Sequence, residues 1–354
     1  MKSSRIVKII FITVLPLTLT ACSSIGYYSQ SVIGHNKIMW ARKSVDKIIE
    51  TAEEPLRTQL VTAQQIRQYA IDHLALPDND SYSTYVNLPR DYPVWSVVAA
   101  EEFSMQAREW CYPVIGCASY RGYFSEQSAL DYAEALKAKG FETTVGGAVA
   151  YSTLGWFSDP LLPSMLRYGE AYLAETVFHE LAHQVLYVNG NSAFNEAFAS
   201  VVGEQGALQW LAENSPELLE DYQQKMVIYN EFVDLLNGTK EGLINVYSQE
   251  VSVQQKRQMK QQVIEKLKEN YELKKANDWQ NQGYFDSWFE KSINNARLAS
   301  VSTYRDQMPP LHTLLVACDY DFANYFSVLK RITDKYPQDQ ILTNLPEQCD
   351  MDIG

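Results

Sequence analysis

The sequence has little positive charge, few histidines and no apolar run long enough to span a membrane. Its 354 residues include 30 Lys and Arg against 43 Asp and Glu, which gives a net charge of −13. Such an acidic surface repels phosphate backbones, so we expect no nucleic-acid partner. The hydrophobic content of 46% allows a sizeable buried core and excludes a disordered or fibrous chain.

The apolar stretch at residues 9–21 has 13 residues, too few to cross a bilayer core of about 30 Å. It follows the positively charged start M-K-S-S-R-I-V-K, so residues 1–21 are typical of a secretory signal peptide. The stretch ends in L-T-A-C, which resembles the bacterial lipoprotein signal. We therefore predict that Cys22 is acylated and anchors the mature chain in the cell envelope. Ser23 favours an outer membrane, with the protein facing the periplasm; an ordinary cleaved signal is the alternative.

The cysteines that remain after Cys22 are Cys111, Cys117, Cys318 and Cys349. In an oxidising compartment an even number suggests disulfides, and four cysteines allow three pairings. Pro113 and Gly116 suit a tight turn, which favours a bond between Cys111 and Cys117. Free thiols are the alternative. No C-x-x-C pair occurs, which counts against a cysteine-based zinc site.

Hydrophobic periodicity predicts a predominantly helical α+β fold, with one domain over residues 22–354. We expect a helical layer over 22–75, a mixed α/β part over 76–165 and a helical half over 166–354. The mixed part is expected to contain strands at 92–100 and 141–151 and a helix at 128–139. The helical half is expected to contain helices at 171–187, 194–211 and 251–275.

The strongest motif is F-H-E-L-A-H at residues 178–183. His179 and His183 are four residues apart on a predicted helix, so two imidazole nitrogens can converge on one metal ion. Glu180 lies roughly 100° further round the helix, where it can act as general base on an attacking water. The pattern predicts a zinc-dependent peptidase with one Zn²⁺ per chain and a peptide substrate.

A catalytic zinc site of this kind needs a third protein ligand. No third histidine follows the motif, but F-N-E-A-F-A-S follows at residues 194–200, after a short turn that folds the next helix back beside the first. Glu196 is therefore predicted as the third ligand, and the segment resembles the N-E-A segment of thermolysin-like peptidases and zinc aminopeptidases. The separation from His183 is shorter than in those families. Glu204, two turns further along, is the alternative ligand.

Several segments together resemble a family of bacterial envelope lipoproteins described as predicted aminopeptidases. The matching segments are G-Y-Y-S-Q (26–30), W-C-Y-P-V-I-G-C-A-S-Y-R-G-Y-F (110–124), A-Y-S-T-L-G-W-F-S-D-P-L-L (150–162), F-H-E-L-A-H-Q (178–184) and F-N-E-A-F-A (194–199). The resemblance implies a zincin-like fold, in which the H-E-x-x-H helix packs against a glutamate-bearing helix. It also implies zinc peptidase activity with a preference for free N-termini.

Other residues carry weaker predictions. Tyr120, Arg121 and Tyr151 are candidates for contacts to the substrate or the transition state, because peptide hydrolysis needs a donor to the developing oxyanion. Glu175, one turn before His179, is a candidate to support the metal ligands. An aminopeptidase also needs a carboxylate for the substrate ammonium group, for which residues 101–102 are the candidates. An endopeptidase acting on envelope proteins or peptidoglycan peptides, and a non-catalytic zinc-stabilised scaffold, are the alternative functions.

Overall fold

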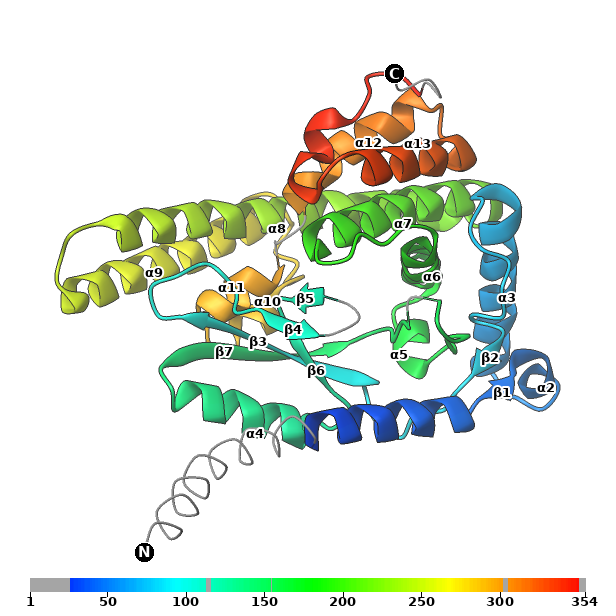
Figure 1. Ribbon diagram of the computed structural model, residues 1–354, viewed down its shortest axis with the longest axis horizontal. Helices are drawn as coiled ribbons and strands as arrows, with labels where there is room; N and C mark the ends of the chain where they lie inside the picture. The colour runs from blue at the N-terminus through cyan, green and yellow to red at the C-terminus, as the bar shows by residue number, and fades with distance from the viewer. Residues whose placement is uncertain (1–25, 113–115, 154, 302–304, 350–354) are drawn as a thin grey trace, which may run out of the picture.

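A computed structural model describes residues 26–112, 116–153, 155–301 and 305–349. The predicted signal peptide and Cys22 lie outside the described residues. The described part of the chain is mostly helical and carries three small antiparallel sheets, which confirms the predicted α+β class (Figure 1).

The N-terminal part is a helical layer that borders the main core. Residues 26–40 form a helix, which is followed by α2 (Val45–Ile49) and α3 (Leu56–His73). Along α3 the side chains of Leu60, Ala63, Ile66 and Ala70 are buried, at the spacing of three and four residues that makes one helix face apolar. A short sheet pairs β1 (Lys43–Ser44) with β2 (Thr84–Tyr85).

The central sheet has the strand order β6-β3-β7, with both neighbours antiparallel to β3. Its strands are β3 (Val94–Glu101), β6 (Arg121–Tyr123) and β7 (Phe141–Ala148). Alternate residues of β3 face opposite sides, and both sides are covered. Val97 and Ala99 pack with α4 (Glu126–Lys137), whereas Val98 and Ala100 pack against α11 (Asn295–Val301). This double burial explains the continuous apolar run that predicts the strand.

Two disulfides close local loops. Cys111 and Cys117 are bonded between β4 (Trp110–Tyr112) and β5 (Gly116–Ala118), which is the pairing favoured by the sequence. Cys318 and Cys349 are bonded near the C-terminus, where the chain closes beside the last helices.

The helical half surrounds α6 and α7, which pack extensively against each other. Its elements are α5 (Pro163–Leu166), α6 (Glu170–Val185), α7 (Ser192–Asn214), α8 (Pro216–Ser248), α9 (Val253–Asn277), α10 (Asp286–Phe289), α12 (Met308–Ala317) and α13 (Phe322–Lys335), with 3-10 turns at Arg305–Gln307, Gln338–Gln340 and Leu342–Asn344. In Figure 1, α3 flanks the α6 and α7 pair on one side, and α12 and α13 lie above α7. Side chains of α3, α6, α7, α12 and α13 form one large core, so α6 is enclosed in the interior of the fold.

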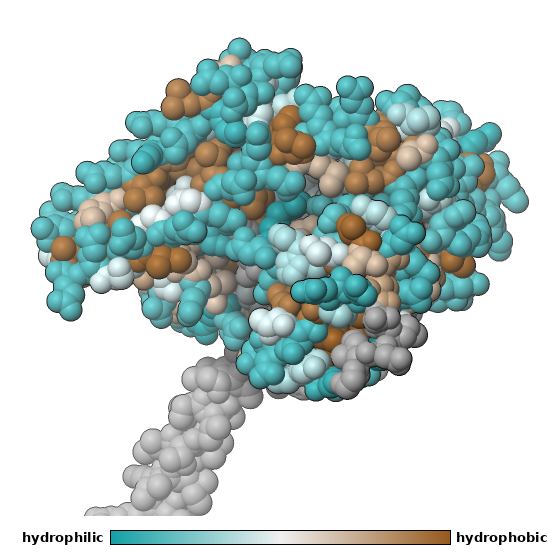
Figure 2. Space-filling model, turned by 90° about the horizontal axis from the view of Figure 1, so that it is seen from above, coloured by the Kyte–Doolittle hydropathy of each residue, from teal (hydrophilic) through white to brown (hydrophobic). Residues whose placement is uncertain are grey.

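A second core lies in the long hairpin of α8 and α9. Phe232, Leu236, Leu267 and Tyr271 are buried there together with Trp279. The rest of α9 is largely exposed, as its charged sequence predicts. Among the described residues, no helix combines the length and the apolar character needed to cross a bilayer. On the face seen in Figure 2, hydrophobic residues form separate patches among polar ones.

Candidate metal centre

Helix α6 brings the two histidines of the motif together in the interior. Its opposite face buries Leu173, Val177 and Leu181 in the main core, which fixes the rotation of the helix. His179 and His183 then extend from the same side, with their Nε2 atoms 3.2 Å apart. The same nitrogen of each ring is therefore presented to one point.

The turn between α6 and α7 is closed by asparagine side chains. The Asn191 carboxamide oxygen accepts the backbone N–H of Phe194 (3.2 Å) and caps α7. The Asn195 side chain accepts the N–H of Val188 and donates to its carbonyl oxygen, both at 2.8 Å. Asn195 thus ties the first turn of α7 to the segment that follows α6, and these two bonds help to set the position of the next residue, Glu196.

Glu196 completes a group of three possible metal ligands. Its Oε2 lies 3.3 Å from His179 Nε2, and its Oε1 lies 3.7 Å from His183 Nε2. The possible ligand atoms of the three residues all lie within 4.8 Å of one another. The alternative candidate, Glu204, faces elsewhere and accepts a hydrogen bond from Arg305 Nη2 at 2.7 Å. Of the two glutamates, the structure brings Glu196 to the histidines.

Gly203 allows the two helices to approach closely beside this group. A Cβ atom at this position would lie 2.8 Å from the carbonyl oxygen of Glu175 and 3.1 Å from the Cβ of His179. Both distances are shorter than an ordinary carbon contact, so a larger residue would force α6 and α7 apart. The short distance from Glu196 to the histidines therefore depends on a glycine two turns further along α7.

The electrostatics of the group favour a cation. Burial lowers the pKa of His183 to about 4, so its imidazole is neutral at pH 7, as a metal ligand requires. Burial acts against a charged Glu196, but the hydrogen bond from His179 and the nearby imidazoles outweigh it and lower the pKa of the carboxyl. The ionised carboxylate in turn raises the pKa of His179 against the effect of burial. Positive charge is thus stabilised where the three side chains meet.

Glu180 lies beside the group without belonging to it. Burial raises the pKa of Glu180 to about 7; the charges of Glu196 and Asp159 add to the shift, while His179 opposes it. The Ser152 hydroxyl hydrogen bonds to both Glu180 and Asp159. Asp159 itself is fully buried and accepts hydrogen bonds from the N–H and the hydroxyl of Thr153 at 2.9 and 2.8 Å. A carboxyl with a pKa near neutrality is suited to accept and release a proton.

A second set of charges lies behind His179. Tyr222 of α8 donates a hydrogen bond to Glu175 at 2.9 Å, and Arg305 pairs with Glu204. Burial raises the pKa of Glu175, and the charge of Glu204 adds to the shift. The charge of Glu175 is among the groups that raise the pKa of His179, so this carboxyl adds to the preference for positive charge at the metal group.

The three candidates for substrate contacts lie in different surroundings. The Arg121 guanidinium is 3.8 Å from the centre of the Tyr27 ring and 4.8 Å from that of Tyr132. The Tyr151 hydroxyl hydrogen bonds to His35 Nδ1 at 2.9 Å. Tyr120 is half exposed, and its pKa is raised by burial and by the charges of Glu196, Tyr187 and Glu180. Glu196 and Glu180 are both among the groups that raise the pKa of Tyr120, whereas the charged group that raises the pKa of Tyr151 is Asp159.

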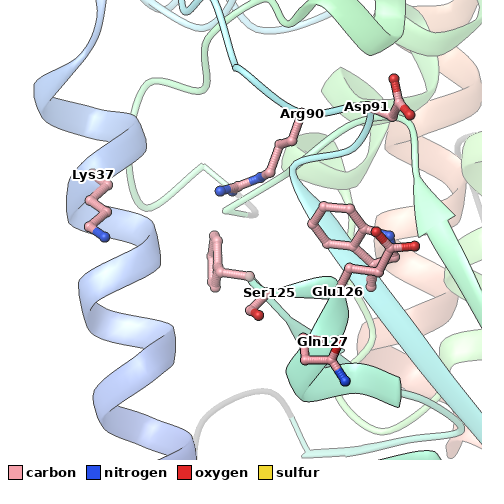
Figure 3. A pocket seen from close by; sticks show the side chains of 8 residues that line it. Lys37, Arg90, Asp91, Ser125, Glu126 and Gln127 are labelled. Carbon is pink, nitrogen blue, oxygen red and sulfur yellow. The ribbon is translucent and has the colours of Figure 1, made fainter. Parts of the chain in front are cut away.

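Two open cavities lie apart from the metal group. One, of about 620 Å³, separates the helix of residues 26–40 from the start of α4 (Figure 3), and it is lined by Lys37, Arg90, Asp91, Trp95, Phe124, Ser125, Glu126 and Gln127. The other, of about 310 Å³, is lined in part by Glu101 and Glu102. Glu102 also accepts a hydrogen bond from Arg257 Nη2 at 2.9 Å. Its carboxylate is therefore already paired with a cation.

The donor set fits a metal ion. Two imidazole nitrogens and one carboxylate oxygen suit a zinc-type divalent ion, which on binding would displace the proton that the raised pKa of His179 favours. With a glutamate next to the first histidine, they form a group that could hold a metal ion beside a potential base.

The chain belongs to the family described as "Putative aminopeptidase", which matches residues 26–341. Membership indicates peptide hydrolysis. No curated protein and no solved structure matches the chain.

The sequence did not reveal several residues of this centre. Asn195 entered the sequence analysis only as part of the N-E-A segment. A glycine in a predicted helix does not by itself indicate that Gly203 packs against His179. The partner of Glu204, Arg305, is separated from it by 101 residues. Such long-range pairs leave no periodic signal in one sequence.

Proposed function

We propose that this protein is a zinc-dependent peptidase that removes residues from free N-termini. The observation that supports this proposal best is the convergence of His179, His183 and Glu196, with Glu180 adjacent, in a chain of the aminopeptidase family. His179 and His183 would hold the ion through their imidazole nitrogens, and Glu196 would hold it through its carboxylate.

The reaction divides between the ion and the side chains. A bound Zn²⁺ would act as a Lewis acid toward the scissile carbonyl and lower the pKa of water. Glu180 takes a proton from the attacking water as the water oxygen bonds to the carbonyl carbon. As the C–N bond breaks, Glu180 gives that proton to the leaving amine nitrogen. The environment that raises the pKa of Glu180 to about 7 suits both steps.

Tyr120 is our candidate for the donor to the oxyanion. Its side chain is half exposed, and the charges of Glu196 and Glu180 are among the causes that raise its pKa, after burial, which supports this choice over Arg121 and Tyr151. A neutral phenol keeps its proton at pH 7 and can donate a hydrogen bond to developing negative charge.

The proposed location is the bacterial cell envelope. A lipid on Cys22 would lie four residues before Gly26, the first described residue, so the folded part would stay close to the membrane. Two disulfides agree with an oxidising compartment such as the periplasm. The substrates are then peptides that reach the periplasmic face of the outer membrane.

Two variants separate metal binding from catalysis. Glu180→Gln keeps the shape of the side chain and removes the base, so zinc should stay near one per chain while peptide turnover falls by roughly 10²- to 10⁴-fold. Glu196→Ala should lose zinc and activity together, because two histidines hold zinc weakly. Full zinc in Glu196→Ala would remove this residue from the ligand set. Full activity in Glu180→Gln would contradict the mechanism.

Peptides with free and blocked N-termini test the substrate class. An aminopeptidase releases single residues from free peptides and leaves N-acetylated copies intact. Cleavage of both forms at internal bonds would assign the endopeptidase alternative. Bound zinc without turnover of any peptide would assign a zinc-stabilised scaffold.

A further inference from the structure

The two most exposed large hydrophobic side chains in the described part of the chain are both tryptophans. Trp40 is 81% exposed and Trp156 is 73% exposed, and Phe157, next to Trp156, is 53% exposed. A single exposed apolar residue is ordinary, but several that gather on one surface mark a place where a partner binds. The question is therefore whether these residues belong to one surface.

Trp40 ends a helix whose outer face carries several apolar side chains. Along residues 26–40, Gly34 packs against the ring of Phe124 and Ile38 is buried, which marks the inner face of the helix. In Figure 1 this helix, in dark blue, lies along the lower edge of the molecule. Four large apolar side chains of the helix are exposed: Tyr28, Val32, Ile33 and Trp40.

Two contacts hold the loop of Trp156 against this helix. The ring centres of His35 and Phe157 lie 4.6 Å apart. Arg42, just after the helix, donates a hydrogen bond from Nη1 to the carbonyl oxygen of Ser158 at 2.8 Å. One contact lies before the last residue of the helix and the other after it. The loop and the end of the helix are therefore neighbours on one surface.

The loop presents its aromatic side chains from an ordered turn. The backbone N–H of Trp156 donates to the carbonyl oxygen of Thr153 at 3.1 Å. The backbone N–H of Phe157 donates to the Thr153 hydroxyl, also at 3.1 Å. These bonds fix the backbone while both aromatic side chains remain in contact with solvent.

The position of the predicted anchor indicates a lipid bilayer as the partner. Cys22 lies four residues before Gly26, the first described residue. Four residues span at most about 14 Å, so an acyl chain on Cys22 would hold the start of the helix close to the membrane surface. Tryptophan and tyrosine side chains favour the interface between lipid headgroups and acyl chains. The exposed aromatic residues thus lie on the segment that the anchor would bring to the bilayer.

The charge of this segment also suits a membrane. Residues 26–45 include Lys37, Arg42 and Lys43 and no acidic residue, although the chain has 43 Asp and Glu. Residues 155–158 of the loop carry no acidic residue either. Anionic lipids repel an acidic surface and attract a basic one. This surface can therefore approach a bilayer that the rest of the acidic chain avoids.

We propose that the exposed face of residues 26–40, together with Trp156 and Phe157, lies in the headgroup region of the membrane. The contact orients the folded part of the chain relative to the bilayer, whereas the lipid on Cys22 tethers it. This inference rests on the proposed envelope location. The face inserts only a few side chains, so without the acyl group its binding is weak and is lost on dilution and washing.

Vesicles of phosphatidylethanolamine and phosphatidylglycerol test this face without the anchor. The protein used is residues 23–354, which lacks Cys22 and contains every described residue. We expect it to float with vesicles at high lipid concentration and to dissociate on dilution. Trp40→Ser and Trp156→Ser should each weaken the partition roughly tenfold, because each removes a large apolar side chain from the interface.

Leu273→Ser is the matched control. The side chain of Leu273 is 60% exposed on α9, in the hairpin of α8 and α9, so its replacement should leave the partition unchanged. Because all three replaced side chains are exposed, each variant should keep the wild-type Tm.

Two results would overturn the proposal. The first is a wild-type chain that does not bind vesicles, or whose binding Trp40→Ser and Trp156→Ser leave unchanged. The second is self-association without vesicle binding that Trp40→Ser abolishes, which would assign the face to a second copy of the chain. Acylation is measured separately, from the mass of the N-terminal peptide of wild-type protein extracted from membranes. A missing acyl group would contradict the proposed anchor, whereas an acylated protein whose unacylated form ignores vesicles would contradict this inference.

Discussion

Replacing Gly203 with alanine tests whether the close packing of α6 on α7 maintains the metal group. A Cβ at this position would lie 2.8 Å from the carbonyl oxygen of Glu175, which is itself held in the backbone of α6. Because neither backbone can yield locally, the two helices must separate by several tenths of an ångström. Glu196, on the same helix as Gly203, would then move away from both histidines.

The size of the effect follows from two opposing contributions. Alanine in a helix is more favourable than glycine by about 1 kcal/mol. Overpacking of a well-packed interior costs about 1–3 kcal/mol. Gly238 on α8 supplies the control, because a Cβ there meets nothing within 4 Å. Gly238→Ala should therefore stabilise the protein, and Gly203→Ala should be less stable than this control by about 2 kcal/mol, or roughly 4 °C in Tm.

Thermal unfolding, zinc analysis after dialysis and peptide turnover on both variants provide the assay. We expect Gly203→Ala to lose zinc and activity, and Gly238→Ala to retain both with a higher Tm. If the two variants are equally stable and equally loaded with zinc, the contact at Gly203 does not maintain the metal group and the reasoning is refuted.

Two further predictions concern the anchor and a buried acid. Cys22→Ala should shift the protein from the membrane to the soluble periplasmic fraction, and continued sedimentation with washed membranes would contradict lipidation. Burial raises the pKa of Asp159 to about 6, so the folded state binds this proton more tightly than the unfolded chain does. The free energy of unfolding should therefore fall by about 3 kcal/mol as the pH rises from 4 through 6. In Asp159→Asn, the free energy of unfolding measured with urea should depend less on pH over this interval. An unchanged pH dependence would exclude Asp159 as its cause.

Local signals in the sequence indicated that His179, His183 and Glu196 come together, and the structure places their possible ligand atoms within 4.8 Å of one another. The spacing of His179 and His183 depends only on helix geometry, and the short turn before α7 leaves little freedom for Glu196. The helix predicted at 128–139 begins earlier, at Glu126, because the Ser125 side chain caps it by accepting the N–H of Ser128. Capping and periodicity act within a few residues, so one sequence can report them.

The surroundings of the site could not be predicted in the same way. The loop at residues 79–82 reaches Gln184 across about a hundred residues, and nothing near Asn79 or Ser81 in the sequence indicates that helix as their partner. The surroundings of Arg121 are another example, because nothing near it in the sequence indicates that its guanidinium lies over the rings of Tyr27 and Tyr132. The bond between Cys318 and Cys349 likewise depends on how the last helices close.

Helix α8 belongs to both hydrophobic cores. Near its start, Tyr222 packs in the main core and bonds to Glu175, whereas Phe232, Leu236 and Leu243 lie in the core of the distant hairpin. Local opening of such a helix proceeds from the less protected end, so the hairpin can exchange its amide hydrogens while the first turns of α8 remain closed. Unfolding of α8 that continues past Ile228 to Tyr222 would break the hydrogen bond from Tyr222 to Glu175. The hairpin can therefore accumulate destabilising changes over evolution before the centre is disturbed.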